Sequence, residues 1–277
     1  MDTDATIVVT GAAGFIGSHV AQAMLARGHR VVGIDNFDPY YPADLKRQNL
    51  AEITGPAETT AETTNAADRF ELAELDIRDE RGIAGLFERT KPAGLIHLAA
   101  KAGVRPSLAD PVGYADVNVT GTSVLLKAAA ATGCERAVLA SSSSVYGNNP
   151  RVPFSEADEL TGPISPYAAT KASLEHVAHA HAHLSGMPTA CLRFFTVFGP
   201  RQRPDLAIGL FLRKIAAGEP IAMFGDGSTS RDYTFIDDCV AGILAAWDRI
   251  DQHGFRVWNL GSDTPIRLDE LIATIGG

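Results

Sequence analysis

Short apolar runs alternate with longer stretches of helical pattern through the first two-thirds of the chain. The apolar runs predict strands at Ile7–Thr10, Val31–Ile34, Phe70–Leu75, Gly94–His97, Arg136–Ala140 and Thr189–Arg193. The stretches between them predict helices at Phe15–Ala26, Arg81–Arg89, Val112–Ala131 and Tyr167–Ser185. Short buried strands that alternate with helices indicate an α/β fold: a doubly wound parallel sheet with helices on both faces.

The alternation becomes irregular beyond Arg193, where glycine and proline gather at Gly199–Pro204 and Gly218–Gly227. We therefore expect two parts, an α/β domain over residues 1–193 and a smaller lobe over residues 194–277.

One segment of the first part departs from both patterns. Thr54–Asp68 is rich in Thr, Ala and Glu and has no aromatic residue. Such a composition buries little apolar surface, so we expect a mobile surface insertion.

Composition and charge narrow the class of protein. The chain has 277 residues, of which 45% are hydrophobic and 21% charged, as in soluble globular proteins. A net charge of −9 without a Lys/Arg block argues against a nucleic-acid partner. Cys134, Cys191 and Cys239 are isolated, which fits a reducing compartment. No apolar run has the length of a membrane span, and the chain starts with a strand pattern without a signal peptide, so we expect a cytoplasmic protein.

The first strand runs into a glycine-rich turn that opens a helix. Gly11 permits the tight turn, Gly14 lets the backbone approach a pyrophosphate, and Gly17 lets the helix pack close to the sheet. Asp35 ends the second strand, where a carboxylate accepts hydrogen bonds from a ribose diol and repels a 2′-phosphate. The pattern predicts a Rossmann-type domain that binds NAD in preference to NADP. Packing glycines and a loop aspartate are the alternative.

Two further strand ends belong to the same predicted site, since ligands of doubly wound sheets bind beyond the carboxyl ends of the strands. Asp76 and Ile77 follow the third strand and are candidates for flanking an adenine. Leu98, Ala99 and Ala100 follow the fourth, where small residues let a cofactor lie close to the backbone. We interpret His97 as a packed or hydrogen-bonded histidine.

A candidate base lies downstream. Tyr167 and Lys171 are four residues apart, which places both on one face of a helix. A neighbouring ammonium and an oxidised nicotinamide ring favour the phenolate of a tyrosine, whose pKa is otherwise about 10. The preceding strand ends in the run Ser141–Ser144, whose hydroxyls can bind a substrate and pass a proton to Tyr167. A surface lysine and a serine-rich loop are the alternatives.

Together these motifs resemble the extended short-chain dehydrogenase/reductase superfamily and, within it, the nucleotide-sugar 4-epimerases. The resemblance covers nearly the whole chain and is strongest to UDP-glucuronate 4-epimerases in three segments: Asn36–Tyr41, Ala102–Arg105 and Thr196–Pro204. Residues that match the family's motifs also include Phe15, Ile16, Asn36 and Asn118 at the cofactor site.

The resemblance implies a reaction and roles. Tyr167 takes the proton from the hydroxyl on carbon 4 of a UDP-sugar, NAD takes and returns the hydride through a transient 4-keto sugar, and Lys171 binds the ribose hydroxyls. The catalytic hydroxyl falls on Ser142 or Ser144, and the sequence does not decide between them. The residues implied to contact the UDP-sugar are Ser142, Ser143, Ser144, Thr196, Arg203 and Arg231. Related dehydratases and decarboxylases carry an acid where this chain has Ser144, which favours epimerisation of UDP-glucuronate to UDP-galacturonate.

Two alternatives remain open. One is a 4-epimerase for UDP-glucose and UDP-galactose or their N-acetyl forms, and the other is a catalytically silent NAD-binding sensor or fragment. Similar epimerases continue past Gly277, so the C-terminal lobe is expected to be incomplete. His176, His179 and His183 share a helix face, which we interpret as solvated or as part of a homodimer interface, with no metal.

Overall fold

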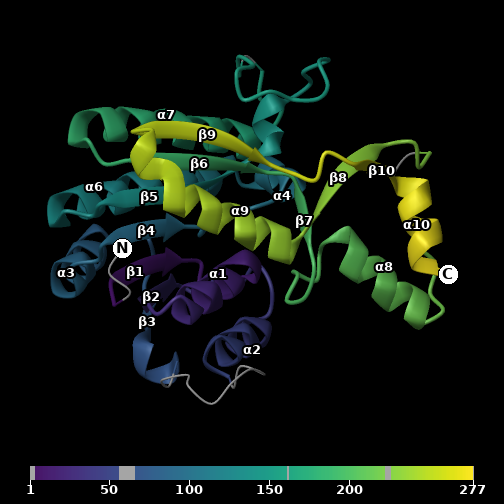
Figure 1. The fold of residues 1–277 in the computed structure, drawn as a ribbon. Coiled ribbons are helices and arrows are strands. Elements are labelled where there is room, and N and C mark those ends of the chain that lie inside the picture. The colour runs from purple at the N-terminus through teal and green to yellow at the C-terminus, as the bar shows by residue number, and fades with distance from the viewer. Residues whose placement is uncertain (1–3, 56–65, 161, 222–225, 277) are drawn as a thin grey trace.

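The sheet at the centre of the molecule has seven parallel strands. A computed structural model of the protein describes residues 4–55, 66–160, 162–221 and 226–276. The strands run in the order β3-β2-β1-β4-β5-β6-β9, and each pairs in parallel with its neighbours (Figure 1). Their bounds are β1 Thr6–Thr10, β2 Arg30–Asp35, β3 Phe70–Glu74, β4 Gly94–His97, β5 Arg136–Ser142, β6 Thr189–Phe194 and β9 Phe255–Leu260. The predicted α/β doubly wound fold is confirmed.

Helices cover both faces of this sheet, and alternate strand residues point to each. Ile7 and Val9 of β1 pack into one apolar core with α1 Phe15–Ala26, α2 Ala43–Thr54 and α9 Ile236–Arg249. Val8 packs into the other core, with α3 Glu80–Thr90, α6 Thr122–Thr132 and α7 Pro166–Ser185.

The helix expected at Val112–Ala131 is divided in the structure. It consists of α5 Pro111–Ala115, a π-helical turn at Asp116–Gly121 and α6. Asn118 lies in that turn, where its side chain binds both backbone polar groups of Lys101 and the hydroxyl of Thr170. π-Helical turns often mark functional sites.

Helix α2 was not expected from the sequence. Its buried residues are Lys46, Asn49 and Ile53, so two of the three positions that face the core are polar. The amide of Asn49 donates to the carbonyl of Ala13. A helix whose inner face is polar gives little apolar periodicity.

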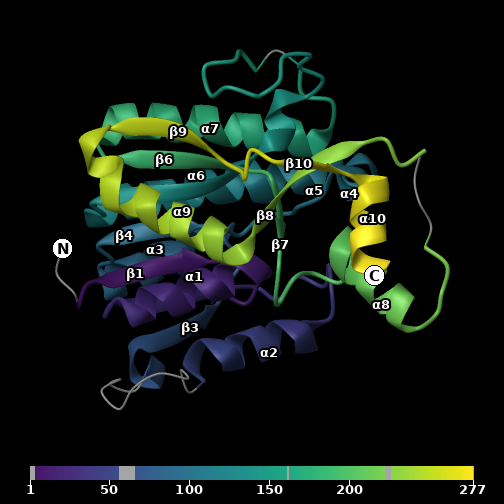
Figure 2. The ribbon, with the colours of Figure 1, turned by 45° about the vertical axis from the view of Figure 1, so that its right-hand side comes forward.

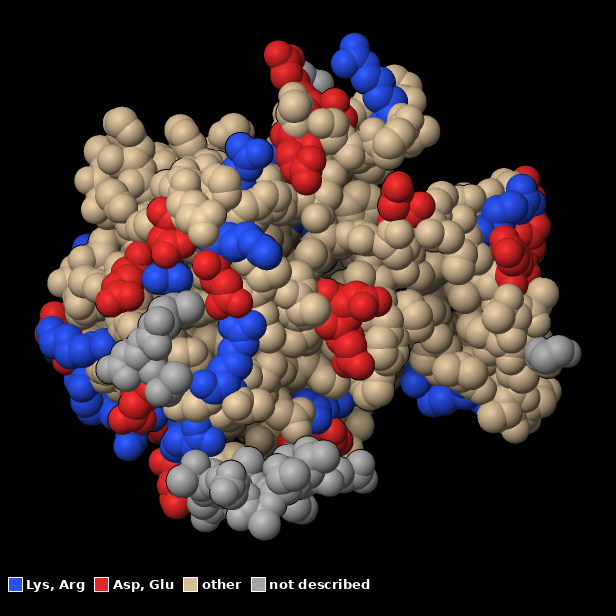
Figure 3. Space-filling model, viewed as in Figure 1, with Lys and Arg blue, Asp and Glu red and all other residues tan. Residues whose placement is uncertain are grey.

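A smaller lobe stands beside the sheet (Figures 1 and 2). Its three-stranded sheet has the order β10-β8-β7, with β7 Thr196–Phe198, β8 Ser230–Phe235 and β10 Pro265–Arg267. It carries α8 Ala207–Ala216 and α10 Leu268–Gly276. Figure 3 shows this lobe projecting from the body, with a face in view that is mostly uncharged and carries a few acidic and basic side chains.

The division expected at residue 193 needs correction. After the first part of the lobe the chain returns to the main sheet, since α9 packs in its core and β9 pairs with β6. Residues 194–277 therefore contribute to both parts. The pairing of β9 with β6 joins residues far apart in sequence, so local patterns do not reveal it.

The remaining described elements are short. They are the helix α4 Val104–Ala109 and helical turns at Ala66–Arg69, Ser143–Tyr146 and Ile250–Gln252. The insertion predicted at Thr54–Asp68 falls largely on residues 56–65, which lie outside the described residues.

A substitution at Trp247 tests whether α9 packs in the core of the main sheet. Its side chain is 1% exposed, and Trp247→Ala should lower the free energy of unfolding by about 3–5 kcal/mol because it leaves a large cavity. Urea denaturation measures this, with Leu212→Ala on α8, 51% exposed, as a control expected within about 0.5 kcal/mol of the parent. Equal effects of the two substitutions would contradict the packing described above.

Candidate functional site

A cavity of about 400 Å³ lies at the carboxyl ends of the main strands. Its wall combines the glycine turn after β1 with residues of α7 and of the segment that leads into the small lobe. Twelve of the predicted cofactor residues line it besides Tyr167 and Lys171: Gly11, Gly14, Phe15, Ile16, Gly17, Asp35, Asn36, Asp76, Ile77, Leu98, Ala99 and Ala100.

The glycine turn is tight enough to exclude side chains. Gly11 has φ +69°, and a Cβ on it would lie 2.9 Å from the amide nitrogen of Ala99. A Cβ on Gly17 would lie 2.0 Å from the carbonyl oxygen of Gly11. The N-terminus of α1 therefore approaches the turn closely, with free N–H groups and the positive end of the helix dipole at the cavity. These features fit the pyrophosphate of a dinucleotide.

Asp35 is a buried carboxylate held by three partners. It accepts hydrogen bonds from the amides of Ala13, at 3.1 Å, and Phe37, at 2.9 Å, and the ammonium of Lys46 lies 3.7 Å away. Because a carboxylate offers about four acceptor positions, Asp35 can still accept from a ribose diol. Sequence reasoning missed Lys46, which also lines the cavity.

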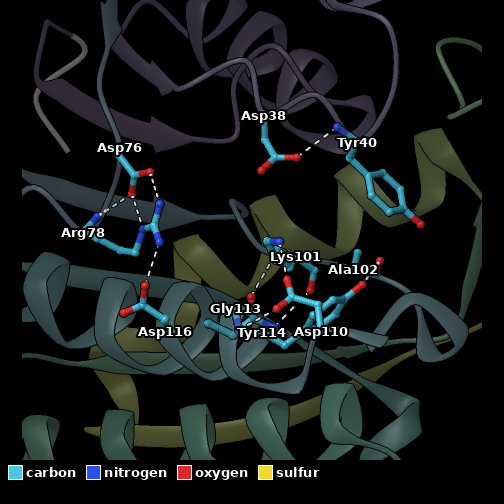
Figure 4. A network of polar contacts seen from close by, with 11 residues as sticks. Asp38, Tyr40, Asp76, Arg78, Lys101, Ala102, Asp110, Gly113, Tyr114 and Asp116 are labelled. Atoms are coloured by element: carbon cyan, nitrogen blue, oxygen red, sulfur yellow. Dashed lines mark hydrogen bonds and ion pairs between the residues drawn. The ribbon is translucent and has the colours of Figure 1, made fainter. Parts of the chain in front are cut away.

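Asp76 lines the cavity and belongs to a charged cluster with Arg78 and Asp116 (Figure 4). Its carboxylate accepts from the Arg78 guanidinium and the Asn36 amide, and Arg78 also pairs with Asp116 at 2.6 Å. The hydrogen bonds from Arg78 lower the pKa of Asp76 to about 2. Asp76 therefore stays an acceptor at neutral pH.

Of the predicted cofactor residues, only Asn118 is absent from the cavity wall. Its bonds to Lys101 and Thr170 instead join the segment after β4 to α7. In the same region the hydroxyl of Tyr114 donates to the carbonyl of Ala102 (Figure 4), and its ring meets that of Tyr167 edge-on, with centroids 6.2 Å apart. These contacts fix the wall around Tyr167.

Helix α7 presents Tyr167 and Lys171 to the cavity. Ser165 is the N-cap of the helix, where its hydroxyl accepts a hydrogen bond from the amide of Ala168, and Pro166 occupies the first helical position. Lys171 is 2% exposed, and its ammonium donates to the carbonyl of Ala140 on β5 at 2.7 Å. Burial lowers the pKa of Lys171 to about 8.

Burial raises the pKa of Tyr167, and two neighbouring residues partly offset this rise. The hydrogen bond with Ser142 and the positive charge of Arg203 both lower that pKa, but burial outweighs them. Before a cofactor binds, Tyr167 is thus a neutral phenol. The sequence led us to expect help from Lys171, whereas the cation that acts on Tyr167 in this structure is Arg203.

The serine run separates into distinct environments. Ser142 donates to Ser144 at 3.1 Å and bonds to Tyr167, so it is the better placed of the two candidates for the catalytic hydroxyl. Ser144 lines the cavity and Ser143 does not. Ser141 lines it too, and its hydroxyl donates to Glu175.

On the side of the small lobe, Thr196 and Arg203 line the cavity. Arg203 pairs with Asp205 at 3.1 Å and lies over the ring of Tyr40, 5.1 Å from its centroid. Arg231 lies exposed on β8 and does not line the cavity, so its predicted contact with substrate stays a prediction.

Tyr40 and Tyr41 also line the cavity and were not singled out as site residues. The hydroxyl of Tyr41 is buried without a hydrogen-bond partner among the described residues, and burial raises its pKa to about 12. The family-like segment Asn36–Tyr41 was the signal that could have found them.

Histidines are not part of this site. His97 is buried between the hydroxyls of Thr10 and Thr122, as expected of a packed histidine, and burial lowers its pKa to about 3. His176, His179 and His183 are exposed on α7. Within the described ranges, no three His, Cys, Asp or Glu side chains are grouped to hold a metal ion, and no helix is long and apolar enough to cross a membrane.

Comparison with known proteins identifies the family. The model of the NAD dependent epimerase/dehydratase family matches residues 7–261. The chain belongs to this family.

Several relatives in the family have named activities. A probable UDP-glucuronate 4-epimerase of Rhizobium meliloti (strain 1021) is 39% identical over 285 residues, which cover 97% of this chain and 80% of that protein. UDP-glucuronate 4-epimerase 4 of Arabidopsis thaliana is 39% identical over 282 residues, which cover 96% of this chain and 62% of that protein. This chain therefore spans less than two-thirds of the plant relative.

Solved structures agree with this assignment. The UDP-glucuronic acid 4-epimerase of Bacillus cereus, in complex with UDP-glucuronic acid and NAD, is 36% identical with a TM-score of 0.85, covering 98% of this chain and 82% of that one. The UDP-glucose 4-epimerase of Thermotoga maritima with UDP-glucose is 30% identical with a TM-score of 0.82, and the match covers 98% of this chain and 81% of that one.

The buried ammonium of Lys171 should make stability depend on pH. Its pKa is about 8 in the folded protein and 10.5 ordinarily, so between these values the unfolded chain binds more protons. Stability should therefore rise with pH across this window, by about 1.4 kcal/mol per unit of pKa difference. Urea denaturation from pH 7.5 to 10.5 should show this rise in the parent relative to Lys171→Met. Parallel curves for the two proteins would contradict it.

Proposed function

We propose that this protein is an NAD-dependent UDP-sugar 4-epimerase that interconverts UDP-glucuronate and UDP-galacturonate. One observation carries the proposal: a single cavity is lined both by the glycine turn at Gly11–Gly17 and by Tyr167, Lys171 and Ser142. A dinucleotide on that turn and a base for a sugar hydroxyl would thus share one cavity. The named activities of the relatives support the same reaction.

We assign separate roles in cofactor binding and proton transfer to the residues that line the cavity. Gly11–Gly17 would hold the pyrophosphate, Asp35 a ribose diol, and Asp76 and Ile77 would flank the adenine. NAD, when bound, supplies the hydride acceptor and donor for carbon 4 of the sugar. Tyr167 takes and returns the proton of the hydroxyl on that carbon, and Ser142 hydrogen-bonds the same oxygen. Lys171 would bind the hydroxyls of the nicotinamide ribose through its ammonium.

Arg203 is the proposed anchor for the uronate. Its side chain reaches the cavity with 19% of its surface exposed, and it acts electrostatically on Tyr167. Its Nε and Nη2 groups donate to Asp205, and its Nη1 group is proposed to donate to the carboxylate of a uronate, a charge-assisted hydrogen bond that a neutral hexose does not offer. Thr196, Ser144 and Arg231 are proposed as further contacts to the UDP-sugar.

Tyr167→Phe tests the base. The variant should lose about 10²–10⁴-fold in epimerisation rate because no other group replaces the phenol oxygen, whereas NAD should still bind. The assay is chromatographic product analysis after incubation with UDP-glucuronate, UDP-glucose and UDP-N-acetylglucosamine in turn. Full activity of the Phe variant, or no product from the parent with any donor, would overturn the assignment.

Arg203→Met tests the substrate. It should raise KM for UDP-glucuronate by about tenfold or more, which is the loss of roughly one charge-assisted hydrogen bond. KM for a neutral UDP-hexose should change less, so the hexose serves as the internal control. Equal changes for both substrates would argue against a carboxylate anchor.

We further propose a cytoplasmic homodimer. Free, buried thiols at Cys134, Cys191 and Cys239 fit a reducing compartment. Leu108 on α4 and Val112 on α5 are 63% and 78% exposed, and a second subunit would cover such apolar side chains.

The double variant Leu108→Glu/Val112→Glu tests the dimer. It should halve the molar mass measured by light scattering, because charges placed at an interface must be desolvated there. A parent protein that is monomeric, or a variant with unchanged mass, would contradict this arrangement.

A further inference from the structure

A buried charged network lies directly behind Lys171. Glu175, one helical turn further along α7, is 5% exposed and pairs with Arg193 of β6, which is 3% exposed. The Arg193 guanidinium donates to both carboxylate oxygens, at 2.9 and 2.8 Å. The hydroxyl of Ser141 donates to the same carboxylate.

The network extends from α7 to the last strand of the sheet. Arg193 also donates to the hydroxyl of Tyr146 at 2.8 Å, and that hydroxyl donates to Asn259 of β9 at 2.6 Å. The ring of Tyr146 stacks on Phe154 with centroids 4.6 Å apart. Figure 1 shows β5, β6 and β9 as neighbours beside α7.

Three successive residues of β5 bind three successive turns of α7. Ala140 accepts from Lys171, Ser141 donates to Glu175, and Ser142 bonds to Tyr167. Glu175 therefore belongs to the same strand–helix contact that sets the two residues of the proposed reaction, although it does not line the cavity.

Titratable groups on α7, β4 and β6 interact with Lys171. Burial lowers the pKa of Lys171, and a negative charge on Cys191 of β6 or on Glu175 of α7 would raise it. Among the described residues, His97 on β4 also interacts with Lys171, and the pKa values of His97 and Cys191 place both in their neutral forms at neutral pH. Glu175 is thus the anion of this group.

We propose that Glu175 is a positioning residue for the proposed epimerase reaction: clamped by Arg193 and Ser141, it fixes α7 on β5 and supplies the negative charge that keeps Lys171 an ammonium. The inference rests on the proposed function of Lys171. A buried ion pair is in general weak evidence for stability, because desolvation offsets the attraction. Its position behind Lys171 gives this pair an electrostatic effect on the site.

Glu175→Gln removes the charge and keeps the shape. The high-pH limb of the kcat profile, which reports loss of the Lys171 proton, should move to lower pH by about one unit. Activity at pH 6.5 should fall much less than activity at pH 8.5. The affinity for NAD, measured by titration calorimetry over the same pH range, should show the same displacement.

Two variants separate this role from a structural one. Tyr146→Phe removes a hydroxyl from Arg193 but leaves the Glu175 charge, so it should lower the melting temperature without moving the limb. Glu175→Asp keeps the charge and should restore the limb. Glu175→Gln leaves Arg193 unpaired and for that reason can fail to fold. In that case the double variant Glu175→Gln/Arg193→Gln should still move the high-pH limb to lower pH, by less than one unit.

The outcomes are distinct. A limb that stays in place in Glu175→Gln, or in the double variant, with only a lower melting temperature, would overturn the inference. A parent protein without epimerase activity would overturn the proposed function, and the NAD titration would then decide whether Glu175 controls Lys171.

Discussion

The donation from the Lys171 ammonium to the Ala140 carbonyl is the contact around which the site is built. It places a cation that burial disfavours at the carboxyl end of the central strands. Such a group persists only where the surrounding structure provides hydrogen bonds and opposite charge. Ser165 and Pro166 fix where α7 begins, and Glu175 lies one turn beyond the lysine, so the helix is held at both sides of this contact.

The two sides of the cavity are built by different physical means. The dinucleotide side is made mostly of backbone: tight glycine contacts, a helix N-terminus and small residues after β4. The reactive side is made of side chains whose pKa values are displaced by burial, and whose partners come from β5, α7 and the small lobe. On the dinucleotide side the cofactor must approach the backbone closely, so glycines are found there. On the reactive side the buried ammonium of Lys171 needs a compensating negative charge, and the Glu175–Arg193 ion pair lies behind it.

Local patterns predicted most of the residues that line the first side and a smaller part of the second. Gly11 lies close to Gly17 in sequence, and Tyr167 lies four residues before Lys171, so the spacing within each motif carried the information. The choice between Ser142 and Ser144 depends on how α7 docks on β5, which no local spacing encodes. Lys46 was missed because α2 turns polar residues inward, and β9 because its pairing with β6 is a long-range contact.

The late return of the chain to the main sheet has a consequence for biosynthesis. One face of the sheet is covered partly by α9, and β9 shields the outer edge of β6, yet both follow the whole first part of the small lobe in sequence. While the ribosome is still making residues before Ile236, the apolar surface destined for Trp247 and an unpaired strand edge stay open to solvent. Nascent chains with these features are prone to association, and this period of exposure lasts until α9 and β9 have emerged.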